Sequence, residues 1–183
     1  MPSTHDIQPG DVIAFWRDAG PSRWFKKDEA FDRQFRDRFI AAHEAAARGE
    51  LDSWQRSPKG ALALCILLDQ FPRNAFRGSA RMFATDAKAR DVARAALQSG
   101  FDQQAGEQMR QFFYLPFMHS EQLADQDFCV ELTSRIGEES ARYARMHRDI
   151  ISRFGRFPHR NAVLGRETTP AEQRFLDEGG FSG

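Results

Sequence analysis

Phenylalanine recurs every four residues at Phe31, Phe35 and Phe39. This period matches the turn of an α-helix and lines the three rings along one apolar stripe. An amphipathic helix is therefore predicted over residues 28–48, ended by Gly49. No stretch of the chain alternates polar and apolar residues for long enough to indicate a β-strand. The chain is predicted to be all-α, a compact array of roughly eight antiparallel helices.

Capping residues and prolines divide the rest of the chain into further helices. Ser57 and Pro58 are suited to begin a helix that is apolar on nearly every side through Leu68, so we expect this helix to be buried. Pro72 lacks an N–H group and disfavours helical geometry at Phe71, so the helix is predicted to stop there. The other predicted helices span residues 11–18, 86–98 after Thr85, 105–115, 120–136 after Ser120, 138–154, and 170–178 after a Thr169 capping box.

The spacing of these helices is also informative. Predicted starts near residues 85 and 119, and near 104 and 138, are 34 residues apart in each pair. This separation is the period of tetratricopeptide repeats, which are built from helix–turn–helix units. The Trp, Leu-Gly and Tyr pattern of that repeat is absent from the sequence. The spacing therefore supports a tetratricopeptide-like arrangement only in a loose sense.

Size and charge restrict the class of protein. A chain of 183 residues suits a single domain over residues 1–183. Lys and Arg together number 26, as do Asp and Glu, so no overall field favours nucleic acid or an anionic membrane. The first residues lack a signal-peptide pattern, and no apolar run approaches the roughly 20 residues that span a bilayer. We expect a soluble, cytoplasmic protein with Cys65 and Cys129 as buried thiols.

One phrase occurs twice, at residues 71–78 and 157–166, and the second copy has one inserted residue, His159, before Arg-Asn-Ala. Each copy ends an apolar helical run, turns at a proline and presents Arg-Asn-Ala, so each is predicted to be a rigid loop that carries arginine outward. If the two loops meet, they form a basic cleft for a carboxylate or phosphate. The alternative is that the arginines pair with internal acids such as Asp69, Asp86 or Glu121. The candidate ligand-binding residues are Arg73, Asn74, Arg77, Tyr114, Arg153, Arg156, Arg160 and Asn161.

Histidine and glutamate supply the candidates for catalysis. His119 and Glu121 lie around a predicted helix start, where they could act as acid and base, and His159 lies in the second loop. The alternative without catalysis is that Glu121 stabilises the helix dipole from the first turn and that His119 is a hydrogen-bonded residue at the helix start. His147 is predicted to be a core residue, and His43 to lie midway along an exposed helix. The HExxH pattern of metalloproteases is absent, and we predict neither a metal nor a cofactor.

Three segments together resemble a known family. They span residues 67–74, 113–121 and 153–162, and the flanking residues 12–16, 24–25 and 179–181 fit as well. The chain is similar in these segments to the bacterial domain-of-unknown-function nine-two-four family. This resemblance covers nearly the whole chain and implies an all-α fold similar to the tetratricopeptide superfamily. At Gln122 the family usually has a second acid, which weakens a two-carboxylate or metal site there. The family is functionally uncharacterised, so the resemblance implies a fold and no reaction.

Two functions are compatible with these residues. The first is a binding module for an anionic small molecule or a peptide carboxylate, which requires fewer coincidences. The alternative is an enzyme for an anionic substrate, with His119 and Glu121 or His159 as acid and base. A third, RNA contact through the second loop, is disfavoured by the neutral net charge. If Arg73 and Arg160 are ligand arginines, replacing either with alanine should leave Tm unchanged or raise it. A loss of roughly 3–5 kcal/mol would indicate structural ion pairs instead.

Overall fold

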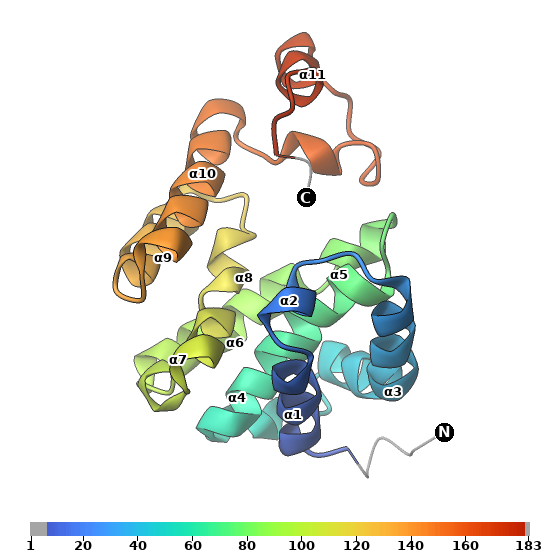
Figure 1. The fold of residues 1–183 in the computed structure, drawn as a ribbon, viewed down its shortest axis with the longest axis vertical. Helices are drawn as coiled ribbons and strands as arrows, with labels where there is room; N and C mark the ends of the chain where they lie inside the picture. Colours follow the sequence, from blue (N-terminus) through green and yellow to red (C-terminus); the bar gives the residue numbers. More distant parts are fainter. Residues whose placement is uncertain (1–6, 182–183) are drawn as a thin grey trace. The chain divides into compact units, whose positions relative to one another are not determined.

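The structure is a computed structural model that describes residues 7–181, and every regular element in this range is helical (Figure 1). The predicted all-α class is confirmed. Within the described range, residues 7–77 with 81–116 form one compact unit, and residues 78–80 with 117–181 form a second. A single domain over residues 1–183 stays a prediction. His5 lies outside the described residues.

The first unit begins with three helices, and the third of these begins and ends close to the predicted residues. Asp28 accepts the N–H groups of Ala30 and Phe31 through Oδ1, at 3.0 and 3.1 Å, and so begins the long helix α3. Gly49 ends α3 with a φ of 86°, a left-handed conformation that favours glycine. The α-helices of this part are α1 (Pro9–Ala19), α2 (Pro21–Trp24) and α3 (Glu29–Arg48).

The buried helix predicted after Ser57 is the centre of the first unit. It starts as α4 (Pro58–Cys65), widens into a π-turn over Ile66–Gln70, and continues as α5 (Phe71–Ala75). Every residue from Gly60 to Pro72 is buried, as expected from its apolar sequence. The prediction that the helix stops at Phe71 is wrong, because the π-turn accommodates Pro72 without ending the helix.

The π-turn shifts the backbone hydrogen bonds, and side chains satisfy the carbonyl groups that it frees. The N–H of Phe71 bonds to Ile66 rather than to Leu67, and Pro72 has no N–H for Leu68. His43 Nδ1 lies 2.9 Å from the Leu67 carbonyl oxygen. Thr85 Oγ1 donates to the Leu68 carbonyl oxygen at 2.6 Å. Thr85 therefore bonds to this helix through its hydroxyl instead of capping the next one, which corrects its predicted role.

Aromatic rings fill the space between α1, α3 and the central helix. The predicted stripe of Phe31, Phe35 and Phe39 is buried, and Trp16 of α1 packs against it. Phe71 joins the cluster with its ring centroid 5.1 Å from that of Phe35. The first unit is completed by α6 (Asp86–Gln98), α7 (Glu107–Arg110), the start of α8 (Leu115–Met118), and 3₁₀ turns at Asp52–Arg56, Ala80–Phe83, Asp102–Gln104 and Gln111–Phe113.

The second unit is built on a helical hairpin. Its helices α9 (Leu123–Ser134) and α10 (Glu138–Phe154) pack along each other, and α11 (Pro170–Asp177) follows a long loop with a 3₁₀ turn at Pro158–Arg160. Gly155 ends α10 with a φ of 68°, and Thr169 and Glu172 form the predicted capping box of α11. Ile150, Ile151 and Phe157 form a buried cluster, against which Phe154, Phe175 and Phe181 pack.

Two details of the predicted periodicity are wrong. The helix expected to start after Ser120 begins at Leu123, and the Ser120 hydroxyl donates to Asp125 Oδ2 at 2.7 Å. Helix starts at Asp86 and Leu123, and at Glu107 and Glu138, do not keep a separation of 34 residues. A tetratricopeptide-like arrangement therefore stays a prediction. Within residues 7–181, none of the helices combines the length and the apolar character that crossing a bilayer requires.

Candidate functional site

Arg73, in the first copy of the repeated phrase, lies between two carboxylates. Its guanidinium donates to both carboxylate oxygens of Asp86, at 2.9 and 3.0 Å, and lies 3.2 Å from Asp69 Oδ1. Burial alone would lower the pKa of Arg73, but Asp69 and Asp86 outweigh burial and raise it. The side chain is 16% exposed. The prediction that Arg73 is carried outward is wrong, because these internal acids hold it inside the first unit.

The next two residues of the phrase share a third carboxylate, that of Asp32 in α3. Asn74 Nδ2 donates to Asp32 Oδ1 at 2.7 Å, and Arg77 Nε donates to Asp32 Oδ2 at 2.6 Å. These bonds tie the end of α5 to α3. Around the first copy, two arginines thus face three aspartates, so the local charge does not favour an anionic ligand.

His43 lies next to the π-turn of the central helix, although the sequence interpretation placed it on an exposed helix face. Its ring is buried and stacks on Phe71, with centroids 4.8 Å apart. A carbonyl oxygen only accepts hydrogen bonds, so the contact with Leu67 assigns the proton to Nδ1. Burial lowers the pKa of His43 and favours this neutral form. The signal for this position was its four-residue spacing from Phe39, which continues the apolar stripe of α3.

Glu121 holds the second copy of the phrase in place. Its carboxylate accepts the N–H of Phe157 at 2.8 Å and two guanidinium N–H groups of Arg166 at 2.8 and 3.0 Å. Burial acts to raise the pKa of Glu121, but the bonds from Arg166 and Phe157 outweigh burial, and the pKa lies below its usual value. Because α9 begins at Leu123, the predicted place of Glu121 in the first turn of a helix is wrong. Its carboxylate points to the loop that follows α10.

Glu172 braces the other side of this loop. It accepts Arg156 Nε at 2.6 Å and an Arg156 terminal N–H at 2.8 Å. Asn161 Nδ2 donates to the same carboxylate at 3.3 Å, and Asn161 Oδ1 accepts Arg166 Nε at 3.0 Å. The bond from Arg156 lowers the pKa of Glu172 to about 2 despite burial, and Thr169 adds to this effect. Glu121, Arg166, Asn161, Glu172 and Arg156 thus form one continuous network, called here the loop network.

Arg160 and Arg153 differ from each other in exposure. Arg160 is 6% exposed, donates to the His119 carbonyl oxygen at 2.9 Å and lies 4.5 Å from the Phe157 ring centroid. The prediction that it points outward is wrong, because the second loop folds over it. Arg153 is exposed and lies over the ring of Phe154, at 4.8 Å. No carboxylate in residues 7–181 lies within ion-pair distance of Arg153.

Two of the candidate catalytic residues have other contacts in the second unit. Glu121 is occupied by Arg166 and Phe157, and His159 packs against Phe157 with ring centroids 5.6 Å apart. The catalytic roles of His119, Glu121 and His159 stay predictions. His147 is a buried residue with Nδ1 2.8 Å from the Tyr143 carbonyl oxygen, which confirms its predicted place in the core.

Tyr114 and the cysteines are buried. The Tyr114 hydroxyl donates to Asp102 Oδ2 at 2.8 Å, inside the first unit. Burial raises the pKa of the Cys65 thiol, and raises that of Cys129 to about 12, which leaves both thiols protonated and unreactive. In the described part of the chain, no group of three His, Cys, Asp or Glu side chains is placed to hold a metal ion.

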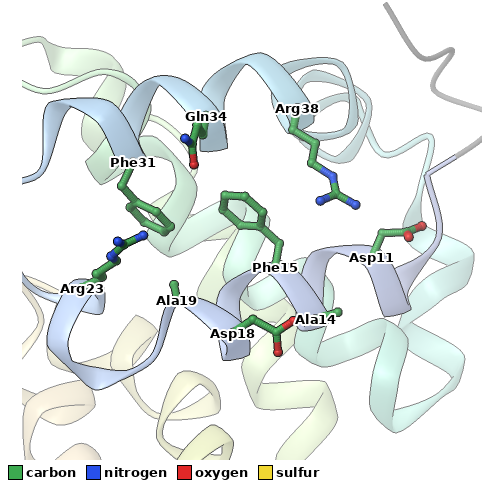
Figure 2. Close-up of a pocket in the computed structure, with 9 residues that line it drawn as sticks. All are labelled: Asp11, Ala14, Phe15, Asp18, Ala19, Arg23, Phe31, Gln34 and Arg38. Carbon is green, nitrogen blue, oxygen red and sulfur yellow. The ribbon is translucent and has the colours of Figure 1, made fainter.

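A groove on the first unit offers an open concave surface. It has a volume of about 380 Å³ and lies between α1, α2 and α3. Figure 2 shows the Phe15 ring rising from α1 between Arg23 at one end and Arg38 at the other, with Gln34 above it. The Phe15 ring stacks on Phe31 at 5.4 Å between centroids. The remaining lining residues are Asp11, Ala14, Asp18 and Ala19.

The two arginines of the groove form no ion pair with an internal acid, although the charge of Arg23 contributes to lowering the pKa of nearby Asp28. Among residues 7–181, no carboxylate lies within ion-pair distance of Arg23 or Arg38. The carboxylate of Asp18 is occupied by Arg17, at 2.9 and 3.0 Å, and that of Asp11 accepts the Gln8 N–H at 2.8 Å. The groove therefore differs from both copies of the repeated phrase, whose charged groups bind one another. Sequence reasoning missed it, because its residues come from three helices and form no motif.

Comparison with known proteins places the chain in a family. A family model described as a bacterial protein of unknown function (DUF924) matches residues 12–180. The chain belongs to this family. A solved structure of a protein of unknown function from Agrobacterium tumefaciens is 53% identical to it, with a TM-score of 0.92, and the match covers 93% of this chain and 97% of that one. No curated protein matches the chain.

The segments that suggested the DUF924 family now have structural roles. Residues 67–74 contain the π-turn and the arginine held by Asp69 and Asp86. Residues 113–121 and 153–162 supply Glu121, Arg156 and Asn161 to the loop network. Gln122, where the family usually has an acid, is the N-cap residue of α9. The resemblance in this DUF924 chain therefore rests on residues that stabilise the fold.

Proposed function

We propose that this protein binds an anionic small molecule or a peptide carboxylate, and that the groove between α1, α2 and α3 is its site. The observation that carries the proposal is the pair of arginines, Arg23 and Arg38, beside the half-buried Phe15 ring. A guanidinium without an internal carboxylate partner retains its full capacity for a carboxylate or phosphate. The groove volume of about 380 Å³ lies in the range of small-molecule sites.

The cleft predicted between the two copies of the repeated phrase, the two-loop cleft, has weaker support. Arg73, Arg77, Arg156 and Arg166 already bind internal carboxylates, so an anion would have to displace a buried partner from them. The cleft stays a prediction for this reason. The catalytic alternative, with His119 and Glu121 or His159 as acid and base, also stays a prediction.

The test uses benzoate, whose ring can stack on Phe15 while its carboxylate reaches an arginine. Side-chain Nε–H resonances of Arg23 and Arg38 are followed by nuclear magnetic resonance during a titration. Both are expected to shift in a saturable way with benzoate and to stay unchanged with neutral benzamide. Arg38→Gln should weaken binding by roughly tenfold or more, since a charged hydrogen bond contributes about 1.5–3 kcal/mol.

Arg48→Gln is the matched control, because Arg48 is exposed on the same helix and binds Glu50. It should leave benzoate binding unchanged. Equal shifts with benzamide would overturn the proposal. Shifts at Arg73 and Arg160 instead of Arg23 and Arg38 would favour the two-loop cleft.

A further inference from the structure

The segment next to the groove presents an aromatic ring to solvent on a firmly held backbone. Trp24 is buried, its Nε1 donates to the Trp16 carbonyl oxygen at 2.6 Å, and its ring meets Phe112 edge-on at 4.9 Å. The following residue, Phe25, is 65% exposed. Because Trp24 anchors the segment, Phe25 is held in position rather than left on a loose loop. An exposed, ordered aromatic side chain is typical of interaction surfaces.

Cationic side chains flank Phe25 in the sequence, and another lies on the helix that follows. Lys26 and Lys27 follow Phe25 directly, Arg23 precedes it at the edge of the groove, and Arg33 lies on the exposed face of α3. No carboxylate among residues 7–181 lies within ion-pair distance of any of these four cations. We name the surface formed by Arg23, Phe25, Lys26, Lys27 and the groove the basic aromatic face.

The acids of the same region are mostly occupied. Asp28 binds backbone N–H groups at the start of α3, Asp32 binds Arg77, and Asp37 lies 3.5 Å from Arg36. Glu29 is exposed in the first turn of α3. The basic aromatic face contains four cations, Arg23, Lys26, Lys27 and Arg38, and two acids, Asp11 and Asp18, so positive charge is in excess there although the whole chain has a formal net charge of zero.

We propose that the basic aromatic face binds an acidic linear segment of a partner protein that carries an apolar side chain. This inference rests on the proposed function, because the groove would receive one carboxylate of the segment while Phe25 packs against its apolar residue. Lys26 and Lys27 would contact further carboxylates. The side-chain amide of Gln34, which has no hydrogen-bond partner among residues 7–181, can bond to a peptide backbone.

Two features favour a peptide over a polyanion or a lipid surface. Asp11 and Asp18 line the groove, and their negative charges would repel a continuous phosphate backbone, whereas a peptide can place neutral residues beside them. A single exposed ring at Phe25 also offers little apolar area for insertion into a bilayer. The charge and shape of the basic aromatic face therefore fit a peptide whose carboxylates are spaced around one apolar side chain.

The experiment measures fluorescence anisotropy of a short labelled peptide of aspartate and glutamate with one central phenylalanine, capped at both ends. Binding should be lost when the acids are replaced by their amides, and weakened when the phenylalanine is replaced by serine. Phe25→Ser should weaken binding roughly fivefold or more, as expected for an aromatic contact at an interface. Lys26→Gln with Lys27→Gln should weaken it and reduce its dependence on salt.

Lys59→Gln, on an exposed position of α4, is the matched control and should leave peptide binding unchanged. Absence of peptide binding, or equal binding by Phe25→Ser, would overturn the inference. If benzoate still binds Arg23 and Arg38 in that case, the proposed function stands and its extension to a partner segment fails. If the peptide binds and benzoate does not, the small-anion site fails instead. Tighter binding of polyuridine RNA or phosphatidylglycerol vesicles than of the peptide would also refute the assignment.

Discussion

Replacing Arg73 with alanine should destabilise the first unit strongly. Arg73 bridges Asp69 and Asp86, and the side chains of these three residues are 16%, 1% and 9% exposed. Removing the guanidinium leaves two carboxylates in a mostly buried position without their cation, a change that typically costs about 3–5 kcal/mol. For a chain of this size, this loss corresponds to a fall in Tm of roughly 6–20 °C.

The assay is urea unfolding followed by tryptophan fluorescence. Trp16, Trp24 and Trp54 all lie in the first unit, so the signal reports on the unit that contains Arg73. Arg48→Ala is the control, because the Arg48 and Glu50 side chains are 56% and 55% exposed and a pair so open to solvent contributes little to stability.

A loss at Arg73 as small as that of the control would refute the assignment of a structural ion pair. Adding Asp86→Asn to Arg73→Ala should recover part of the loss, because one of the two stranded charges is then removed. This expectation reverses the one drawn from sequence, in which Arg73→Ala leaves Tm unchanged or raises it. The reversal follows from the two aspartates that surround the guanidinium.

Three further predictions concern single positions. The pKa of Glu172 is lowered from 4.5 to about 2, so its contribution to stability is present above pH 4.5 and is lost as the pH falls toward 2. Amide exchange in α11 should become faster over this pH range, and Glu172→Gln should remove this pH dependence. Glu121→Gln should speed exchange of the Phe157 N–H, and unchanged exchange would argue against the loop network. A Cβ at Gly60 would lie 2.0 Å from the Trp54 carbonyl oxygen, so Gly60→Ala should cost about 1–3 kcal/mol in urea unfolding, and a variant as stable as wild type would contradict this packing.

Helix positions were largely predictable because local signals determine them. Phe31, Phe35 and Phe39 identify α3 by their period, and Asp28 and Gly49 begin and end it as capping rules require. The exception is the central helix, where the rule that proline ends a helix failed at Pro72. A π-turn is stabilised by contacts from His43 and Thr85, which come from elsewhere in the chain. The local sequence therefore does not predict the π-turn.

The candidate site was predicted less well, because charge pairing is not a local property. Asp32 and Arg77 are far apart in sequence, yet one carboxylate neutralises the arginine. The alternative of internal ion pairs named Asp69, Asp86 and Glu121 as partners, and the contacts confirm all three. Arg23 and Arg38 belong to no sequence motif and were therefore not predicted as site residues. They stand out in the structure because no carboxylate of the described residues forms an ion pair with them.

The extra residue in the π-turn acts as a phase shift in the central helix. One residue rotates everything after it by roughly 100° about the helix axis relative to a continuous α-helix. Arg73 and Asn74 reach Asp86 and Asp32 in the rotated phase. Deleting one residue between Ile66 and Gln70 would restore regular backbone bonding while turning both side chains away from their partners. The apparent irregularity thus sets the alignment of α5 with α3 and α6.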